Sequence, residues 1–276
     1  MSRNWDRTAN HIADWLRDYL RDAEKEGYVV GISGGVDSAV AAGLAVMGVG
    51  HRRVLGLIIP TKFAQNSINA SRVVDWLDIP YLYQPMGTVA TAMQDIMQIK
   101  LDRVAKGNIE ARIRMIVLYA YANAKNYLVL GTTNRSEMEV GYFTKHGDGG
   151  VDLEPIADLY KTEVWELAKH LGVPGPVIRQ APTAGLWKGQ TDEEELGMTY
   201  KELDGYLQSP SNFSSDLAQR VEELRRAAKH KLSMPPCCIP ELLYELEDPV
   251  VERLRLDRDN PADFTIEYKA RVIKEE

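Results

Sequence analysis

A short polar turn near the amino end of the chain has residue types that could hold an anion. The stretch GISGGVDSAV, residues 31–40, places two glycines and two serines directly after an apolar run. Glycines let the backbone approach a phosphate closely, and Ser33 and Ser38 offer hydroxyl donors. Asp37 would repel a phosphate unless a Mg²⁺ ion lies between them. The turn therefore predicts a phosphate site with a metal, and the alternative is a plain tight turn with Asp37 or Ser38 as a helix N-cap.

A second set of polar residues follows an apolar run at 127–133, which predicts a strand. The carboxyl ends of parallel strands share one edge of a sheet, and open α/β sheets bind their ligands at that edge. Glu137, five residues after Thr132, could reach the crevice that holds Asp37, and the two carboxylates would then form a Mg²⁺ site. The alternative is that Glu137 is a first-turn acid that stabilises a helix N-terminus.

Two common phosphate-binding fingerprints are absent from the sequence. No Gly-Lys-Ser or Gly-Lys-Thr occurs, which excludes the Walker A loop, and the turn at 31–38 does not have the form G-x-G-x-x-G. The turn therefore belongs to another class of phosphate-binding loop.

The elements that must position these residues alternate between strands and helices. Apolar runs predict strands at 28–33, 53–60, 79–85 and 127–133. Helical spacing of apolar residues predicts helices at 4–26 (ended by Gly27), from the turn to about Gly48, and at 67–78, 87–99, 107–126, 161–174, 191–208 and 215–232. This order implies an α/β fold, a doubly wound parallel sheet flanked by helices. Without a repeat or a clear linker, one domain over 1–276 is the simplest interpretation.

The bulk composition limits the class of protein. The 276 residues are 45% apolar and carry a formal charge of −7, which argues against a general nucleic-acid binder. The amino end has no apolar signal-peptide core, and no stretch approaches the roughly 18 apolar residues of a membrane span. Cys237 and Cys238 are adjacent and are the only cysteines, so we expect neither a disulfide framework nor a Cys-based zinc site. We therefore expect a cytoplasmic protein without a membrane partner.

The turn at 31–38 resembles the pyrophosphate loop of the ATP pyrophosphatase superfamily, whose members cleave ATP to AMP and pyrophosphate. These include GMP synthetase, asparagine synthetase, argininosuccinate synthetase, tRNA-modifying enzymes and NAD synthetase. The resemblance implies the Rossmann-like fold of the adenine nucleotide alpha hydrolases. The loop alone indicates the superfamily and not the member.

The tract GTTNRSEMEVGYFTKHGDGGVDLEPIADLYKTEV, residues 131–164, is more specific and resembles the NAD synthetase family. It follows the pattern G-T-x-N-x-S-E, then G-Y/F-x-T-K-x-G-D-G-G, then a proline and a lysine-led helix. The resemblance extends to GNIEARIRM at 107–115, PTAGLWKGQTDEEELGMTY at 182–200 and HK at 230–231. Many bacterial members carry Asp-His where this chain has Thr133-Asn134, so adenine-side contacts are expected to differ.

The resemblance implies roles for particular residues. The turn would hold the ATP phosphates through Gly31, Ile32, Ser33, Gly34, Gly35, Val36, Asp37 and Ser38. ATP would also be contacted by Thr132, Lys161 and Thr183. Deamido-NAD would be bound by Arg112, Lys145, Asp152, His230 and Lys231. Mg²⁺ would be bound by Asp37 and Glu137, which with Lys161 would be the catalytic residues.

Several of these residues also fit ordinary structural roles. From spacing alone, Arg112 is a solvated charge on a polar helix face, and His230 and Lys231 are the solvated end of a helix. Lys161 equally fits a surface lysine in the first turn of a helix. Residues 141–153 hold four glycines and no periodicity, which predicts a long loop that is functional or mobile.

A member of the family would amidate deamido-NAD to NAD with ATP and ammonia. The nicotinate carboxylate would attack the α-phosphorus of ATP, pyrophosphate would leave into the turn, and ammonia would displace AMP from the adenylate. The loop at 141–153 would be a lid that excludes water. The sequence shows no amidase pattern with a nucleophilic cysteine, so free ammonia is the expected donor unless a separate glutaminase subunit supplies it. Family members are homodimers.

Two other functions are possible. One is another adenylating amidotransferase, such as a GMP synthetase ATPase domain, which the YFTKHGDGG tract and the His230-Lys231 pair argue against. The other is a nucleotide-binding module without activity, which the pairing of Asp37 with Glu137 argues against because metal ligands suit phosphoryl chemistry.

Overall fold

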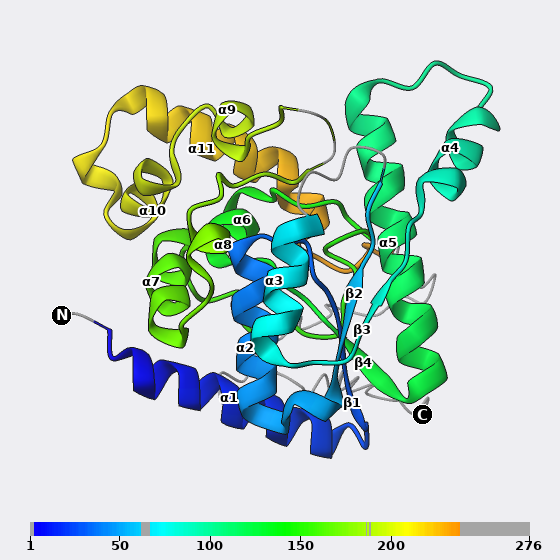
Figure 1. The fold of residues 1–276 in the computed structure, drawn as a ribbon. Coiled ribbons are helices and arrows are strands. Elements are labelled where there is room, and N and C mark those ends of the chain that lie inside the picture. Colours follow the sequence, from blue (N-terminus) through cyan, green and yellow to red (C-terminus); the bar gives the residue numbers. More distant parts are fainter. Residues whose placement is uncertain (1–2, 62–66, 186, 188, 238–276) are drawn as a thin grey trace, which may run out of the picture. The chain divides into compact units, whose positions relative to one another are not determined.

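Four short strands form one parallel sheet (Figure 1). They are β1 (Gly27–Gly31), β2 (Val54–Ile58), β3 (Tyr81–Tyr83) and β4 (Tyr127–Leu130). Their order is β3-β2-β1-β4, so β1 pairs with β2 on one side and with β4 on the other. The gap between the carboxyl ends of β1 and β4 is thus a topological switch point, where such sheets bind ligands.

The computed structural model describes residues 3–61, 67–185, 187 and 189–237. The elements described here belong to the unit that ends at Pro235. Within the described residues, no helix is both long and apolar enough to cross a membrane. The prediction for Cys238 falls outside them.

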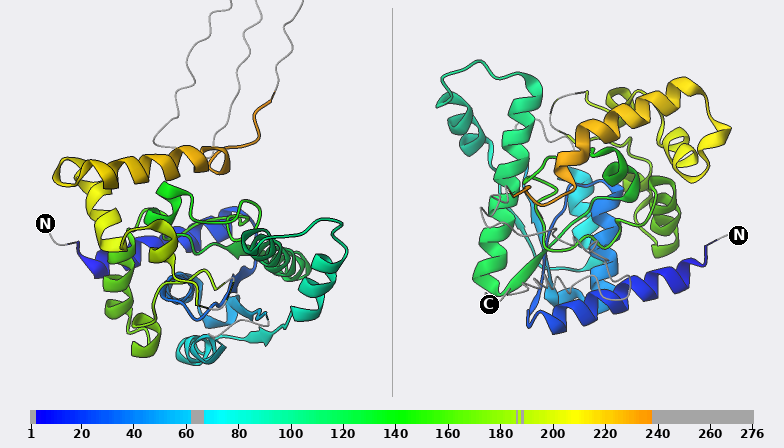
Figure 2. Two further views of the ribbon diagram at one scale, coloured as in Figure 1. Left: turned by 90° about the horizontal axis from the view of Figure 1, so that it is seen from above. Right: turned by 180° about the vertical axis from the view of Figure 1, so that it is seen from behind.

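Helices cover both faces of the sheet, which confirms the predicted doubly wound fold (Figures 1 and 2). One face packs against α1 (Trp5–Asp22), α2 (Val36–Val49), α3 (Ser67–Leu77), α7 (Lys161–Leu171) and α8 (Gly175–Ile178). The other packs against α4 (Gly87–Asp95) and α5 (Arg103–Lys125). Successive residues of β1 point to opposite faces, so Tyr28 and Val30 join the first core while Val29 joins the second.

A third apolar core lies beside the sheet layers. It is built by α6 (Arg135–Val140), α9 (Asp192–Leu196), α10 (Tyr200–Gln208) and α11 (Ser215–Ala228). Trp165 of α7 packs against both this core and the first one. The third core therefore fixes α10 against α7, and this contact is central to the site.

Two predicted boundaries near the amino end are wrong. The helix predicted over 4–26 ends at Asp22, and Gly27 is the first residue of β1 and not a helix stop. A Cβ at Gly27 would lie 2.4 Å from the carbonyl oxygen of Arg53, so the close approach of two backbone segments requires glycine there.

The predicted helices after residue 190 also differ. The helix predicted over 191–208 is two helices, because Gly197 adopts φ +78° and ends α9. The helix predicted over 215–232 ends at Ala228 and is followed by a 3-10 turn, Lys229–Lys231. The other predicted elements are present with shorter or shifted ends. For example, α5 begins at Arg103, where the side chain of Asp102 caps it.

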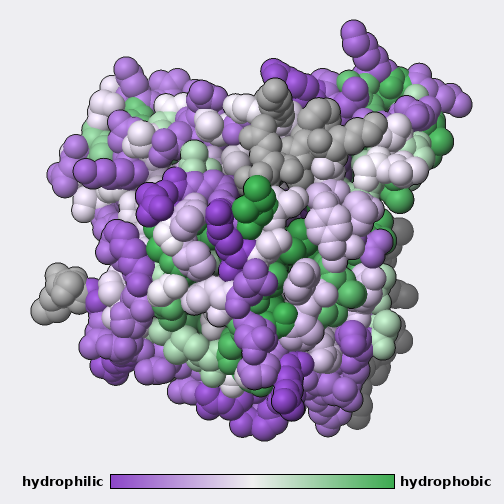
Figure 3. Space-filling model, viewed as in Figure 1, coloured by the Kyte–Doolittle hydropathy of each residue, from purple (hydrophilic) through white to green (hydrophobic). Residues whose placement is uncertain are grey.

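The open edge of the sheet exposes apolar side chains. Figure 3 shows them gathered over α4 at the upper right. The large apolar residues exposed on β3, on α4 and at the C-cap of α4 are here called the edge patch; they are Tyr81, Leu82, Tyr83, Val89, Met93 and Ile96. Exposed apolar surface at a strand edge is typical of a surface that another chain covers.

Candidate active site

A pocket of about 500 Å³ opens at the switch point between β1 and β4, and its size suits a small-molecule ligand. It is bordered by the turn after β1, the segment after β4, the start of α7 and the segment at 180–185. The predicted residues that line it are Gly31, Ile32, Ser33, Gly35, Val36, Asp37, Ser38, Thr132, Glu137, Lys161, Thr183 and Lys231. Nearly all the residues predicted for ATP and metal therefore meet in one cavity, although they come from distant parts of the chain.

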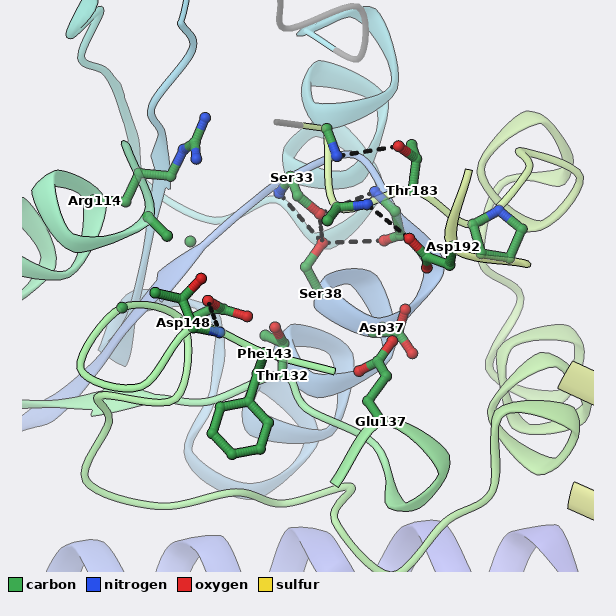
Figure 4. Close-up of a pocket in the computed structure, with 18 of the residues that line it drawn as sticks. Ser33, Asp37, Ser38, Arg114, Thr132, Glu137, Phe143, Asp148, Thr183 and Asp192 are labelled. Atoms are coloured by element: carbon green, nitrogen blue, oxygen red, sulfur yellow. Dashed lines mark hydrogen bonds between the residues drawn. The ribbon is translucent and has the colours of Figure 1, made fainter. Parts of the chain in front are cut away.

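The glycine turn is closed by its own serines (Figure 4). The Ser38 hydroxyl donates to the carbonyl of Gly35 at 3.0 Å, and the Ser33 and Ser38 hydroxyl oxygens lie 3.0 Å apart. Gly34 adopts φ +83°, a conformation that favours glycine, and does not itself line the pocket. The N-cap of α2 is Gly35 without a side-chain hydrogen bond, so the alternative of an Asp37 or Ser38 cap is wrong.

Asp37, Glu137 and Lys161 form an ionic cluster in the pocket. The Lys161 Nζ atom lies 2.6 Å from Asp37 Oδ2 and 3.2 Å from Glu137 Oε1. The Lys161 side chain is only 2% exposed, and those of Asp37 and Glu137 are 17% and 14% exposed. The alternative of a surface lysine at 161 is therefore wrong.

The charges of this cluster depend on one another. Burial disfavours the Lys161 ammonium, but Asp37 and Glu137 outweigh that cost and raise its pKa. Burial also raises the pKa of Glu137; Lys161 opposes this shift, and Asp37 adds to it. Two carboxylates thus share one buried ammonium, and the cluster favours a further positive charge.

Glu137 is the first-turn acid of α6 that the sequence allows as an alternative, and its role as a metal ligand stays a prediction. Its Oε2 accepts the backbone N–H of Asn134 at 3.2 Å, and the Asn134 side chain accepts the N–H of Glu137 at 3.0 Å, which is a capping box. Its Oε1 faces Lys161. The Asn134 amide also donates to Asp37 Oδ1 at 2.9 Å. Asn134, which the sequence connects with altered adenine contacts, thus orients a carboxylate of the cluster.

A divalent cation would suit the two carboxylates. Hard oxygen ligands are those that Mg²⁺ prefers, and it commonly takes only one or two carboxylates beside phosphate and water. Among the described residues, no group of three or more His, Cys, Asp or Glu side chains is arranged to hold a metal. Asp37 and Glu137 therefore fit a metal that arrives together with a phosphate ligand.

Sequence reasoning missed a buried carboxylate, Asp192, that lines the pocket beside the ionic cluster. Asp192 is 3% exposed. Its carboxylate accepts the hydroxyls of Tyr142 and Tyr200, each at 3.1 Å, and the N–H of Ala184 at 2.9 Å. The motif TDEE at 191–194 gives a local signal, but only of the helix cap that Thr191 provides.

The opposite side of the pocket carries two further charged residues that the sequence did not indicate (Figure 4). Arg114 of α5 donates to the carbonyl of Ile59 at 3.2 Å, and Asp148 accepts the N–H of Thr144 at 2.9 Å. Burial lowers the pKa of Arg114, although Glu110 and Asp148 oppose this. Arg114, which also pairs with Glu110 of the same helix at 4.0 Å, lies at the wall opposite the ionic cluster.

Most residues predicted to bind deamido-NAD lie outside the pocket. Arg112 donates to the carbonyl of Lys145 at 3.2 Å, and the Lys145 ammonium donates to the carbonyl of His230. Lys231, which does line the pocket, donates to the carbonyls of Gly141 and Phe143, each at 2.8 Å. Its part-buried ammonium contradicts the alternative of a solvated helix end for that residue.

Asp152 is occupied by contacts within the chain. Its carboxylate accepts the N–H of Val129 at 2.7 Å and the hydroxyl of Tyr119 at 3.0 Å, which ties the 141–153 loop to β4. The loop also bonds to itself, since the N–H groups of Gly147 and Gly149 both donate to the carbonyl of Thr144. Parts of this loop line the pocket, and its role as a lid stays a prediction.

Comparisons with known proteins identify similar chains. A sequence model described as NAD synthase matches residues 8–235. The NH(3)-dependent NAD(+) synthetase of Methanosarcina acetivorans is 42% identical over 256 residues, which are 87% of this chain and 99% of the relative. The NMN synthetase structure from Francisella tularensis is similar with a TM-score of 0.82 and 37% identity, covering 86% of this chain and 99% of that one. The NH3-dependent NAD synthetase structure from Campylobacter jejuni, solved with nitrate, is similar with a TM-score of 0.74 and 28% identity. The match covers 86% of this chain and 100% of that one.

Proposed function

The chain belongs to the NAD synthase family of ligases that form a C–N bond, and we propose that it amidates deamido-NAD to NAD with ATP and ammonia. The observation that carries the proposal is the ionic cluster of Asp37, Glu137 and Lys161 beside a glycine-rich turn in one pocket. The names of the archaeal and Campylobacter relatives support ammonia as the nitrogen donor.

Each part of the pocket has a role in the proposed reaction. The turn at 31–38 and the start of α2 would bind the departing pyrophosphate through backbone N–H groups and the two serine hydroxyls. Thr132 and Thr183, on opposite borders of the pocket, would contact ATP. Positioning of the carboxylate against the α-phosphorus requires no side-chain nucleophile.

Asp37 and Glu137 would hold Mg²⁺, which when bound supplies charge neutralisation for the phosphates. Lys161 pairs with both carboxylates, and the buried Asp192 also acts on its charge. Its ammonium would contact the phosphate oxygens of ATP bound in the same pocket.

A homodimer is also proposed. The edge patch and Ile116 of α5, which is 60% exposed, leave apolar surface that a second copy of this chain would cover. Ile116 lies one helical turn from Arg112, so the predicted substrate residue Arg112 shares its face of α5. The second copy would therefore border the dinucleotide site.

A second candidate function is the amidation of a mononucleotide. The Francisella protein, similar over 86% of this chain, is named an NMN synthetase. The residues predicted to recognise the dinucleotide lie mostly outside the pocket, so the reacting pyridine end and the ATP site would be common to both activities. The ratio of kcat/KM for deamido-NAD and for nicotinate mononucleotide separates the two functions.

The test of the proposed function is a product assay. The protein, ATP, Mg²⁺, deamido-NAD and ammonium should give equal amounts of AMP, pyrophosphate and NAD, and glutamine in place of ammonium should give none. Asp37→Ala should abolish both AMP and NAD formation. AMP release without NAD, or near-normal turnover of the variant at saturating Mg²⁺, would contradict the assignment.

A cytoplasmic location and a single domain over 1–276 are retained as parts of the proposal. The adjacent cysteines in the sequence suit a reducing compartment. The residues on which the proposed reaction depends all lie in the unit that ends at Pro235.

A further inference from the structure

Helix α10 lies outside the sheet layers, yet it places two buried polar side chains beside the ionic cluster. Tyr200 is 0% exposed and Asp204 is 2% exposed. They are four residues apart, so they share one face of the helix. The Tyr200 ring packs in the third core beside Leu203 and Tyr206. Packing explains neither the contacts of its hydroxyl nor the buried carboxylate of Asp204.

Asp204 joins the two segments that carry the cluster. Its carboxylate accepts the hydroxyl of Ser136 and, at 2.8 Å, the N–H of Thr162. The Ser136 oxygen in turn accepts the N–H of Lys161 at 2.8 Å. Ser136 directly precedes Glu137 in the chain, and Thr162 directly follows Lys161. One buried carboxylate thus accepts a free N–H group at the amino end of α7 and a hydroxyl of α6, which fixes the distance between the two helices.

Tyr200 contacts the charged ends of the same residues. Its hydroxyl lies 3.3 Å from Glu137 Oε1 and 3.1 Å from Asp192 Oδ2. Its ring lies below the Lys161 ammonium, 4.9 Å from Nζ to the ring centroid. The ring supports the cation, and the hydroxyl orients the carboxylates.

We propose that Tyr200 and Asp204 are positioning residues that hold Lys161 and Glu137 in the geometry that MgATP requires. Asp204 sets the backbones, and Tyr200 sets the side-chain ends. Lys161 has a long flexible side chain, and a loosely held ammonium would lose much of its effect on a developing charge. The inference rests on the proposed function in one respect, that Lys161 and Glu137 act on ATP.

The test compares Tyr200→Phe with a matched control, Tyr206→Phe. Both changes remove one hydroxyl from a buried tyrosine of α10, but Tyr206 packs against Phe213 in the third core and not against the cluster. Calorimetry gives the Kd and stoichiometry of MgATP, and turnover is then expressed per binding-competent chain. Tyr200→Phe should bind ATP at full stoichiometry with a weaker Kd and a kcat lower by about 10- to 100-fold, as expected for one hydrogen bond to a charged group. Tyr206→Phe should match the wild type.

Asp204→Asn is the second variant, since it keeps the size of the side chain but replaces one acceptor by a donor. It should weaken MgATP binding and turnover in the same way as Tyr200→Phe; if it does not fold, Ser136→Ala, which removes the link to the Lys161 N–H, takes its place. A structural role alone would lower the melting temperature and the binding-competent fraction but leave the Kd and the corrected kcat unchanged. That result for Tyr200→Phe would overturn the proposal. If the wild type made no NAD, the proposed function would fail, while the ATP affinities would still test the positioning of Lys161.

Discussion

Lys161→Met tests whether the buried ammonium is the counter-ion of the cluster. Methionine keeps an unbranched apolar stem and removes the charge. The Asp37 and Glu137 side chains are only 17% and 14% exposed. In the variant they lose the ammonium that lies 2.6 Å from Asp37 Oδ2 and 3.2 Å from Glu137 Oε1 in the wild type. Breaking a buried ion pair costs about 3–5 kcal/mol. Both carboxylates keep some contact with solvent, and Glu137 can bind a proton. We therefore expect the free energy of unfolding to fall by about 2–4 kcal/mol at pH 8.

The loss should depend on pH in a defined direction. Burial already raises the pKa of Glu137 above its ordinary 4.5, and removal of Lys161 raises it further. A folded state whose carboxyl has a raised pKa binds more protons than the unfolded state, so its stability falls as the pH rises. The pKa of Glu137 is already about 8 in the wild type, so both chains lose this stability in parallel up to about pH 8, and the variant should diverge further from the wild type only above that pH.

Urea unfolding followed by circular dichroism measures both quantities. Lys169→Met is the matched control, because Lys169 lies on the same helix, is 58% exposed and pairs with Glu166 at the surface. It should change the free energy of unfolding by no more than about 0.5 kcal/mol. Added Mg²⁺ should stabilise Lys161→Met more than the wild type, since the space between the carboxylates is then free of the ammonium. Equal stability of Lys161→Met and the wild type at pH 8 would refute the counter-ion role.

Two further predictions concern regions beside the pocket. Burial raises the pKa of Glu154 from 4.5 to about 7, although hydrogen bonds from Thr133 oppose this. The contribution of this group to stability is present below pH 4.5 and lost as the pH rises through 7, so Glu154→Gln should be more stable than the wild type by about 1–3 kcal/mol at pH 8. Urea unfolding measures the difference in the free energy of unfolding between the variant and the wild type. If that difference stayed constant between pH 5 and pH 8, the raised pKa of Glu154 would be contradicted. Ile116→Asp should shift the chain from dimer to monomer in sedimentation equilibrium, because it places a charge in the proposed interface, and an unchanged mass would remove α5 from that interface.

The location of the pocket could be predicted because it depends on local signals and one topological rule. An apolar strand, a glycine-rich turn and an apolar helix are each visible within a few residues, and the structure contains them as β1, the 31–35 segment and α2. Parallel strands end at a shared edge, and this rule alone predicts that Asp37 and Glu137 lie in one crevice. Of the two alternatives for Glu137, the structure contains the helix cap, and its second oxygen contacts Lys161.

The partners of the cluster could not be predicted in this way. Lys161 lies 124 residues from Asp37 in the chain, and nothing in its own helix distinguishes it from the exposed Lys169. The predicted helix over 191–208 concealed the break at Gly197, which separates α9 from α10 and lets Asp192 and Tyr200 approach the same carboxylates. Such contacts depend on how the third core packs against α7.

Sequence pattern therefore specifies the order of elements, the family and the edge at which ligands bind, because hydrophobic period, turn chemistry and motif spacing are properties of neighbouring residues. The burial of Lys161, the support from Tyr200 and Asp204, and the position of Arg112 outside the pocket arise only when distant helices pack. Burial and electrostatic environment are set by atoms from separate segments, and no single stretch of the chain contains them.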